Sequence, residues 1–438
     1  MVRILETLRY LTFYITRHVV DRQILKHLGE INNILNNDNA GVFQSPNDNS
    51  LNNILKHAIT TVPWYSEKNI SPALYRFPVT NKSIIRESFD EFCSNGYRQS
   101  DLIAMITSGS TGTPFKIYQD RNKKLRNYAD TLYFAGLAGY KTGHRLVYLK
   151  IWVKEKMKSP LAYRLQNIVP VDVIRFNDRE IEALINRMEK DRSTFGLLGY
   201  ASALELICRY LGRTGHGPVK ADVKSIIAIS ETLNDNTRVS LEKYFGVPAV
   251  SRYSNLENGI IAQQIPGQSG RYLVNSASYH VEILKMDSDE PAAEGDPGRI
   301  VVTDLFNYAM PMIRYDTGDI GSMIHDENFP SRKYLNHVEG RRLDLLYDTG
   351  GNLVSSYIVY KNMWQYTEID QYQLIQEDKK RYTLRINCRE PFKREQKLIG
   401  EFKSYLGQDA DFDVEYVNEI PLLSSGKCKK IVNNYTNA

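Results

Sequence analysis

The sequence has no long hydrophobic run and few cysteines, and these absences exclude several classes of protein. No uncharged apolar stretch approaches the roughly 20 residues that a helix needs to span a bilayer. The N-terminus carries Arg3, Glu6 and Arg9 where a signal peptide needs its apolar segment. The four cysteines lie far apart, with no C-x-x-C pair and no histidine at metal-ligand spacing, which argues against zinc and indicates a reducing compartment. We therefore expect a cytoplasmic protein.

A strong excess of charge of one sign is also absent. The net charge of +5 is the small difference between 56 basic and 51 acidic residues. Basic residues are scattered apart from short clusters at Arg121–Lys124 and Lys427–Lys430. A protein that binds nucleic acid more often shows a dense basic stripe with interleaved aromatic residues, so we expect no nucleic-acid partner. With 438 residues, of which 42% are hydrophobic, the chain is long enough for more than one globular domain.

One segment near the N-terminus is amphipathic. Residues 4–25 have apolar side chains at helical spacing and several arginines. Such a helix can contact a membrane surface from one side, but the favoured interpretation is a helix packed on its own domain.

The most informative stretch is rich in glycine and hydroxyl side chains. It contains Thr107, Ser108, Gly109, Ser110, Thr111, Gly112 and Thr113. Apolar runs on both sides predict a hairpin with this stretch at its tip. Pro114 follows, without the Gly-Lys-Ser/Thr of a P-loop. Glycines that permit positive φ, together with hydroxyls and free N–H groups, indicate a phosphate-binding loop of another kind, and a plain surface turn is the alternative.

The middle of the chain predicts a parallel sheet. Short apolar strands alternate with helices that are stopped by glycine, at 195–198, 202–210, 225–229, 236–245 and 249–252. Ligands bind beyond the carboxyl ends of such strands. Two turns are expected there, Ser230–Thr232 and Tyr253–Glu257.

The remainder changes character. From about residue 260 to 340, strands follow one another through tight turns and predict a β-rich, barrel-like subdomain. A final stretch mixes strands and helices. We predict an α/β protein with a large N-terminal domain (residues 1–342), which has parallel-rich sheets and includes this subdomain. A small, mobile α+β domain (residues 343–438) completes the chain, with the boundary near Arg342–Asp344.

Together, several short motifs in this order resemble the acyl-adenylate-forming superfamily. The chain most closely resembles its phenylacetate–coenzyme A ligase branch and, within it, ligases found with capsular-polysaccharide genes. The motifs are the hydroxyl-rich loop, Lys56-His57-Ala58, Val62-Pro63-Trp64-Tyr65, Pro78-Val79-Thr80-Asn81-Lys82, Tyr253-Ser254-Asn255-Leu256-Glu257, Tyr315-Asp316-Thr317-Gly318-Asp319, Gly340-Arg341 and Gly426-Lys427.

The resemblance implies a nucleotide site. The residues from Thr107 to Thr113 would bind the β- and γ-phosphates of ATP, and Tyr253 would flank adenine. Glu257 would be catalytic and hold Mg²⁺, a cation that prefers oxygen ligands. Asp319 would accept hydrogen bonds from the ribose hydroxyls. The other implied ATP-binding residues are Lys116, Glu231, Ser254 and Arg341.

The resemblance also implies a site for a small carboxylic acid. Lys427, on the mobile domain, would be catalytic and bridge the acid carboxylate and the α-phosphate, where a cation stabilises developing charge. Tyr200, Ser202, Arg252 and His280 are the candidates for the acid pocket.

The implied reaction is activation of a carboxylic acid to its acyl-AMP with release of pyrophosphate, followed by acyl transfer. The acceptor is coenzyme A, or a sugar or amine of surface-polysaccharide assembly. Two alternatives remain. Leu256, where the superfamily has a hydroxyl, and Leu343, in the hinge motif, favour a non-catalytic nucleotide-binding scaffold. Transfer of AMP onto a small molecule shares the first step.

Overall fold

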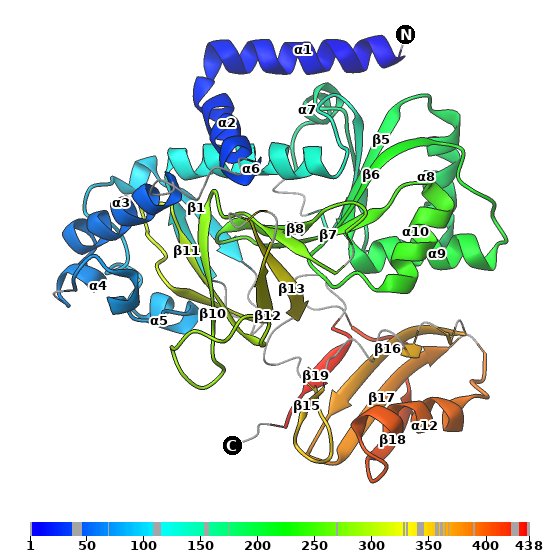
Figure 1. Cartoon of the computed structure of the whole chain (residues 1–438). Coiled ribbons are helices and arrows are strands. Elements are labelled where there is room, and N and C mark those ends of the chain that lie inside the picture. Colours follow the sequence, from blue (N-terminus) through cyan, green and yellow to red (C-terminus); the bar gives the residue numbers. More distant parts are fainter. Residues whose placement is uncertain are drawn as a thin grey trace.

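The structure, a computed structural model, comprises a large N-terminal body and a smaller C-terminal unit (Figure 1). It describes residues 2–36, 46–68, 70–107, 115–152, 157–174, 176–268, 270–326, 329, 332–339, 346–354, 359, 362–363, 365–366, 368–388, 390–421 and 429–435.

One sheet of 11 strands forms the centre of the N-terminal body, in the order β10-β11-β12-β13-β9-β8-β7-β6-β5-β3-β4. The strands at one end of this order are parallel, as the sequence predicted. They are β3 (Arg145–Lys150), β4 (Ile168–Asp172), β5 (Thr194–Tyr200), β6 (Asp222–Ile229) and β7 (Ala249–Asn255).

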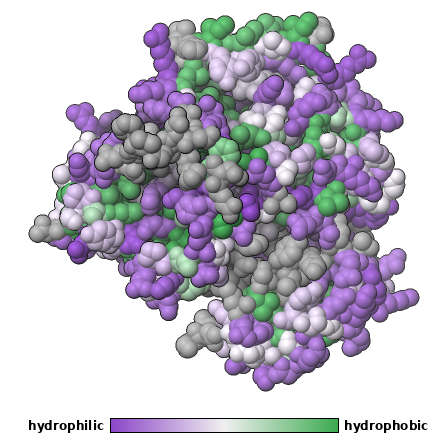
Figure 2. All heavy atoms as spheres, viewed as in Figure 1, coloured by the Kyte–Doolittle hydropathy of each residue, from purple (hydrophilic) through white to green (hydrophobic). Residues whose placement is uncertain are grey.

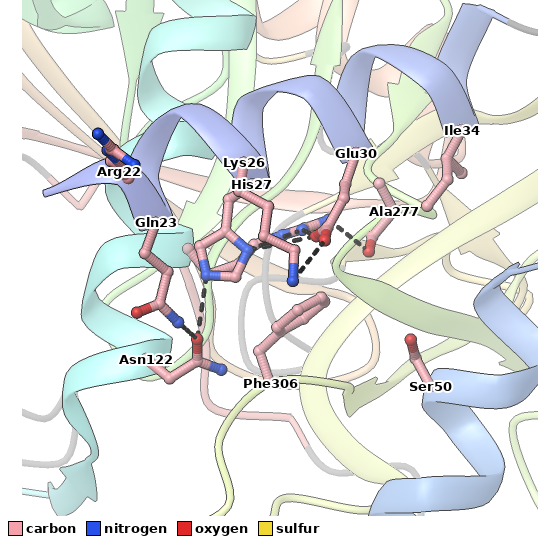
Figure 3. Close-up of a pocket in the computed structure, with 11 residues that line it drawn as sticks. Arg22, Gln23, Lys26, His27, Glu30, Ile34, Ser50, Asn122, Ala277 and Phe306 are labelled. Atoms are coloured by element: carbon pink, nitrogen blue, oxygen red, sulfur yellow. Dashed lines mark hydrogen bonds and ion pairs between the residues drawn. The ribbon is translucent and has the colours of Figure 1, made fainter. Parts of the chain in front are cut away.

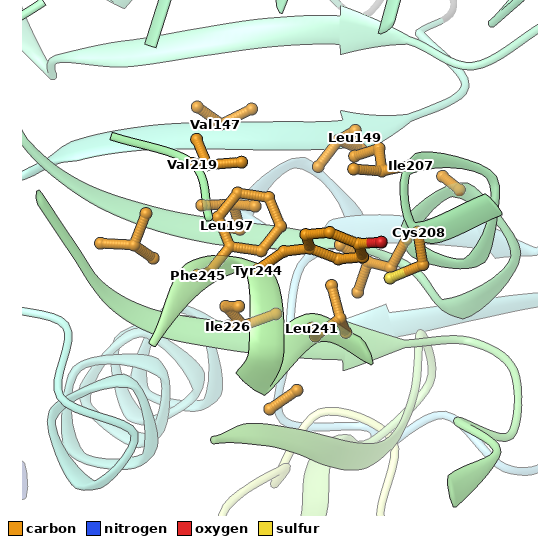
Figure 4. Close-up of a cluster of buried hydrophobic side chains, with 14 of the residues drawn as sticks. Val147, Leu149, Leu197, Ile207, Cys208, Val219, Ile226, Leu241, Tyr244 and Phe245 are labelled. Carbon is orange, nitrogen blue, oxygen red and sulfur yellow. The ribbon is translucent and has the colours of Figure 1, made fainter. Parts of the chain in front are cut away.

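Helices cover both faces of the parallel strands. On one face lie α8 (Asp178–Lys190), α9 (Ala201–Arg213) and α10 (Asp235–Phe245). Figure 4 shows the buried side chains between these helices and the strands, among them Leu197 from β5 and Leu241 from α10. On the other face, Val250 of β7 packs with Ala135 of α6 (Arg121–Leu137).

Local side-chain caps fix where these helices begin and end. Asn177 forms a capping box with Glu180 at the start of α8, and Asn234 accepts from the Thr237 amide at the start of α10. α10 ends at Gly246, whose φ of 71° is a conformation that glycine adopts without strain. The turns at the edge of the sheet are thus set by residues close in sequence.

The other strands of the sheet are antiparallel and continue directly from β7. They are β8 (Gly259–Gln264), β9 (Tyr272–Val274), β10 (Tyr279–Leu284), β11 (Gly298–Asp304), β12 (Tyr315–His325) and β13 (Lys333–Glu339). This part confirms the β-rich segment predicted after residue 260. Because β7 pairs in parallel with β6 and antiparallel with β8, the two parts of the sheet meet at β7.

The N-terminal region supplies further helices and the predicted hairpin. The hairpin pairs β1 (Ile103–Thr107) with β2 (Phe115–Gln119). The helices are α1 (Val2–Val20), α2 (Arg22–Asn36), α3 (Pro46–Thr61), α4 (Pro63–Ser66) and α5 (Lys82–Glu87), with 3₁₀ turns at Leu74–Arg76 and Gln99–Asp101; α7 (Pro160–Leu165) follows β3.

The C-terminal unit has its own sheet, in the order β18-β17-β16-β19, and its own buried core around residues such as Leu374 and Phe402. Its elements are β14 (Leu346–Tyr347), β15 (Leu353–Val354), β16 (Ile369–Gln376), β17 (Arg381–Cys388), α12 (Glu395–Leu406), β18 (Asp411–Tyr416) and β19 (Ile431–Asn433). Because the boundary predicted near Arg342–Asp344 lies outside the described residues, the domain limits 1–342 and 343–438 stay a prediction.

α1 lies on the body through a buried acidic side chain, which the sequence did not predict. The Glu6 side chain is buried and accepts a hydrogen bond from the Thr194 amide at 2.8 Å. A Cβ on Gly143 would come within 2.4 Å of the Glu6 carbonyl oxygen, so the α1 backbone rests directly on this glycine. These contacts confirm that the helix packs on its own domain. An apolar stripe of Ile4, Leu8, Leu11 and Ile15 nevertheless stays exposed, and Figure 2 shows apolar side chains along the upper surface.

Candidate active site

The predicted phosphate loop follows β1 directly. In the hairpin, Ile106 pairs with Lys116 and Thr107 pairs with Phe115, which confirms the flanking strands. Residues 108–114 lie outside the described residues. Phosphate binding by Thr107, Ser108, Gly109, Ser110, Thr111, Gly112 and Thr113 therefore stays a prediction.

Lys116 and Phe115 are successive residues of β2 and project to opposite sides. The Lys116 ammonium bonds the Tyr118 hydroxyl at 2.7 Å and lies over the Phe89 ring. Phe115 stacks on Tyr315 with the ring planes 1° apart. A contact of Lys116 with ATP thus stays a prediction, and Phe115 is the hairpin residue that reaches the site described next.

A buried carboxylate forms the centre of the site. Glu257, in the turn between β7 and β8, is 2% exposed. Its Oε1 accepts from the Tyr315 hydroxyl at 2.9 Å and pairs with the Lys82 ammonium at 2.7 Å. Its backbone carbonyl accepts from the Gln119 side chain at 3.0 Å. Three distant segments therefore fix this carboxylate.

Lys82 was missed from the sequence, although its motif was noted. The Thr80 amide donates to the Arg314 carbonyl and the Asp316 amide donates to the Thr80 carbonyl, so this motif runs beside the start of β12. The Asn81 side chain caps α5. Lys82 is consequently directed at Glu257, 175 positions further along the chain.

The predicted adenine and ribose residues contact each other. The Tyr253 hydroxyl donates to Asp319 Oδ2 at 2.7 Å and lies 3.2 Å from Thr317 Oγ1. Burial, and then the Asp319 charge, raise the pKa of Tyr253 well above its ordinary value. Burial, and then Glu257, do the same to the pKa of Tyr315. Both tyrosines are therefore neutral donors at any ordinary pH, and the two carboxylates accept from them.

A buried network of one ion pair and several hydrogen bonds supports the turn that carries Glu257. Lys123 is fully buried and pairs with Asp304 at 2.6 Å. Its ammonium also bonds the Tyr279 hydroxyl, which donates to the Asn258 carbonyl next to Glu257. The turn is therefore stabilised by an ion pair, Lys123 with Asp304, whose two residues are distant from Glu257 in the sequence.

Two of the residues predicted for the acid pocket, Tyr200 and Ser202, lie where the parallel strand β5 ends and α9 begins. Glu231, which follows β6 and was predicted to bind ATP, accepts from the Ser202 amide at 2.8 Å through Oε2, and its buried Oε1 has no hydrogen-bond partner among the described residues. Tyr200 ends β5 immediately before α9. Ser230 has a φ of 70°, which is a strained conformation for a residue other than glycine and turns the chain sharply at this edge of the sheet.

Arg252, Ser254 and His280 are placed differently from one another. Arg252 and Ser254 lie on β7 on either side of Tyr253. His280 lies on the face of β10 that carries Glu282, which pairs with Arg314 at 3.2 Å. Tyr279, on the opposite face, is the β10 residue that reaches the Glu257 turn. The predicted place of His280 in the acid pocket stays a prediction.

Lys427 and Arg341 lie outside the described residues, so their roles stay predictions. Lys430, three positions after Lys427, pairs with Glu205 of α9 at 2.8 Å. Arg209 pairs with the same Glu205 and donates to the Ile369 carbonyl of β16. These contacts dock the C-terminal unit on the helix that begins at the candidate acid pocket.

The Glu257 carboxylate fits a magnesium ion only in part. Within the described residues, no group bonds its Oε2, and no set of three or more His, Cys, Asp or Glu side chains could form a metal cage. Mg²⁺ often takes one or two carboxylate ligands and completes its shell with nucleotide phosphates and water. The residues present therefore fit a magnesium ion that arrives with a nucleotide.

A cavity of about 710 Å³ lies elsewhere, between α2, α3 and α6 (Figure 3). Its polar side chains pair with one another: Glu30 accepts from Arg126 at 3.0 Å, and His27 bonds Asn122 at 3.0 Å. None of the predicted site residues lines it. Its polar groups hold α2 on α6.

The fold and the site together define the class as a chain built like an acyl-adenylate-forming ligase. A solved 2-hydroxyisobutyryl-CoA ligase in its postadenylation state, in complex with 2-HIB-AMP, superposes with a TM-score of 0.68 at 15% identity, covering 88% of each chain. The same ligase with 2-HIB-AMP and CoA, in the thioesterification state, gives a TM-score of 0.55.

Sequence comparisons narrow this class. Residues 346–434 match the family described as the CapK C-terminal domain. Protein CapK of Staphylococcus aureus is 23% identical over 433 residues, 96% of this chain and 93% of that protein. The phenylacetate-coenzyme A ligase of Pseudomonas putida is 22% identical over 341 residues, 69% and 72% of the two chains. The chain is thus a homologue of CapK and of phenylacetate–CoA ligases, with the fold of acyl-adenylate-forming ligases, which confirms the family resemblance.

Proposed function

We propose that this chain activates a carboxylic acid to its acyl-AMP and then transfers the acyl group to an acceptor. The observation that carries the proposal is the contact of the two predicted nucleotide carboxylates, Glu257 and Asp319, with the neighbouring tyrosines Tyr315 and Tyr253. The ends of two separate motifs, Tyr253–Glu257 and Tyr315–Asp319, contact each other through these two hydrogen bonds. An accidental set of motif matches would not be expected to do so.

The residues present suit the first step. An oxygen of the acid forms a bond to the α-phosphorus of ATP, and the bond from that phosphorus to the pyrophosphate oxygen breaks. Lys82 brings a cation to the carboxylate beside the hairpin, where phosphate charge would be placed. Mg²⁺, bound with ATP at Glu257, would neutralise further phosphate charge. Asp319 would accept from the ribose with Tyr253 packed beside it.

The C-terminal unit would supply Lys427. Lys430 lies three residues after Lys427 in the sequence, and its contact with Glu205 holds this part of the chain against α9, next to the candidate acid pocket. The TM-score is higher with the postadenylation state than with the thioesterification state. This difference supports a pose of the C-terminal unit that resembles the postadenylation state. We infer that the unit rotates to a second pose when the acceptor enters.

For the acceptor we propose coenzyme A, or a sugar or amine of surface-polysaccharide assembly. Support comes from the two sets of relatives, ligases that use coenzyme A and Protein CapK. The mass of the acceptor product separates acyl transfer from AMP transfer.

Acid-dependent exchange of labelled pyrophosphate into ATP tests the first step. We expect exchange with one class of acid, loss of exchange in Lys427→Ala with ATP binding retained, and near-normal exchange in the neighbouring control Lys429→Ala. ATP binding without exchange for any acid would favour the non-catalytic scaffold instead.

We further propose that α1 docks on an anionic membrane surface. Four apolar residues at helical spacing are exposed: Ile4 and Ile15 at 63%, Leu8 at 52% and Leu11 at 47%. α1 also carries arginines, and its single acidic residue, Glu6, is buried. Among the described helices, none is long and apolar enough to cross a membrane. An exposed apolar stripe flanked by arginine suits the surface of an anionic bilayer.

Pairing with a second copy fits less well. The stripe is far smaller than the roughly 20–30 residues a side of a standard interface. Two such helices would also bring arginines together without exposed acidic residues to pair with them.

Vesicle sedimentation tests the membrane proposal. We expect binding to vesicles that contain phosphatidylglycerol, weaker binding to phosphatidylcholine alone, and loss of binding in Leu8→Glu/Leu11→Glu. Val239→Glu, at a residue 65% exposed on α10, is the control. A dimer that this double substitution dissociates would contradict the proposal in favour of self-association.

A further inference from the structure

Arg252 is a charged residue whose side chain points away from the nucleotide site. Successive residues of β7 alternate between the two faces of the sheet. Tyr253 reaches Asp319, whereas Val250 and therefore Arg252 face α6. Tyr200 of β5 pairs with Ile229 of β6, and the preceding Ala228 pairs with Ser251 of β7, so Tyr200 and Arg252 lie at the same level of the sheet, two strands apart. The guanidinium is thus grouped with the predicted acid-pocket tyrosine at the carboxyl edge of the parallel strands.

The Arg252 guanidinium is incompletely bonded. Its Nε donates to Gln263 Oε1 at 2.8 Å, and the Gln263 amide is in turn fixed on the Phe134 carbonyl. Its Nη2 is buried without a hydrogen-bond partner, and no described carboxylate forms an ion pair with it. Arg252 as a whole is partly exposed, so its surroundings are open to solvent.

A second buried arginine shows the fully bonded state for comparison. Arg126 is fully buried, and all three of its nitrogens are bonded: Nε to Ser278, Nη1 to Glu30 and Nη2 to the Ala277 carbonyl. A buried guanidinium without a carboxylate is costly for a protein. Burial lowers the pKa of Arg252 to about 10, which still leaves it charged at neutral pH.

We propose that Arg252 binds a second anionic group of the acid substrate. The acid would carry a carboxylate or phosphate in addition to the carboxylate that reacts. A guanidinium presents a planar fork of donors that matches such an oxyanion, and the bound group would satisfy Nη2. This inference rests on the proposed ligase function and names its class of substrate: acids with two anionic groups.

Matched pairs of acids test the proposal in the exchange reaction. Each pair has one chain length and differs in the second group: a monocarboxylate against the dicarboxylate, and a hydroxy acid against its phosphate ester. We expect one dianionic series to be preferred by about 100-fold or more in kcat/KM, and the two pairs distinguish carboxylate from phosphate. Arg252→Met should abolish this preference by lowering kcat/KM for the dianion alone. Arg238→Met is the control, because Arg238 contacts β7 through the Ala249 carbonyl but is near Asp235.

Two results would overturn the inference: equal use of mono- and dianionic acids by the original chain, or an unchanged preference in Arg252→Met. If no acid supports exchange, the ligase proposal fails separately. The Arg252 site is then judged by calorimetric titration of the same dianionic acids. Tighter binding to the original chain than to Arg252→Met supports it, and equal affinity or no binding contradicts it. Circular dichroism of both variants confirms that they are folded.

Discussion

The two faces of β7 differ in how their polar groups are satisfied. On the nucleotide face, Tyr253 bonds Asp319, and Glu257 in the following turn bonds Tyr315 and Lys82. On the acid face, Arg252 Nη2 is buried without a hydrogen-bond partner among the described residues.

This difference indicates which ligand each face of β7 recognises. On the nucleotide side, Glu257 and Asp319 are bonded by side chains of the protein, so these carboxylates are oriented before a ligand arrives, as electrostatic preorganisation requires. On the acid side, Arg252 leaves a buried nitrogen unpaired among the described residues, and such a group rejects ligands that cannot pair with it. Affinity for the nucleotide and selectivity for the acid are therefore expected to reside in separate residues on the two faces of β7.

Removing the Glu257 charge should have the largest effect. Glu257→Gln keeps the shape of the side chain but removes the anion that pairs with Lys82 and would hold Mg²⁺. We expect pyrophosphate exchange to fall about 10³-fold, the upper range for loss of one preorganised group. Tyr315→Phe removes one hydrogen bond and leaves the anion, so its loss should be smaller. Equal activity of Glu257→Gln and the original chain would remove Glu257 from the mechanism.

Disturbing Asp319 should act on nucleotide binding. Asp319→Asn weakens the acceptor for ribose and for Tyr253, so KM for ATP should rise about 10-fold or more, as for hydrogen bonds to charged groups. The matched control is 2′-deoxy-ATP. It should be a poor substrate for the original chain, and the Asp319→Asn variant should discriminate little between the two nucleotides. Full discrimination in the variant would place the ribose elsewhere.

Neighbouring substitutions on β7 should change stability in opposite directions. Tyr253→Phe loses a buried hydrogen bond to a carboxylate and should lower the free energy of unfolding by about 1–2 kcal/mol. Arg252→Met removes a buried charge whose Nη2 is unpaired but also breaks the hydrogen bond to Gln263, so it should raise the free energy of unfolding by only about 1 kcal/mol. Urea unfolding without ligands measures both. Destabilisation by Arg252→Met would mean that the folded protein does not carry an unpaired charge there.

The smallest expected effect concerns pH and the docked C-terminal unit. Burial acts to raise the pKa of Glu205, but Lys430 and Arg209 lower it more, and the net pKa lies below its ordinary value of 4.5. The pair therefore stabilises docking above pH 4.5, and this stabilisation, about 1 kcal/mol, is lost as the pH falls through the lowered pKa. Limited proteolysis between pH 7 and 4 reports the change. In Glu205→Gln, the C-terminal unit should be cleaved more readily at every pH. If this variant keeps the pH profile of the original chain, the Glu205 pair is not the cause of the pH dependence.

Sequence reasoning predicted what depends on local pattern. The hairpin follows from two apolar runs around a turn, and the parallel strands follow from their alternation with glycine-stopped helices. The resemblance supplied Glu257, Tyr253 and Asp319, and the structure joins Tyr253 directly to Asp319. These features are carried by short motifs in one order along the chain.

Contacts between distant segments could not be predicted in the same way. Lys82 and Lys123 meet their partners only because strands β10–β12 bring remote residues together. The Pro78–Lys82 motif was a signal for Lys82, but no local pattern linked it to Glu257. The exposed stripe of α1 could not be predicted either, because periodicity gives the apolar side of a helix and not the direction in which that side faces.

Direct detection of the intermediate tests the central claim most clearly. The chain would be mixed with ATP, Mg²⁺ and a panel of mono- and dianionic acids, with no acceptor, and the bound products would be identified by mass spectrometry. We expect an acyl-AMP, about one for each protein molecule, formed from one acid class and absent in Glu257→Gln. Intact ATP with every acid, or AMP joined to a group other than a carboxylate, would contradict it.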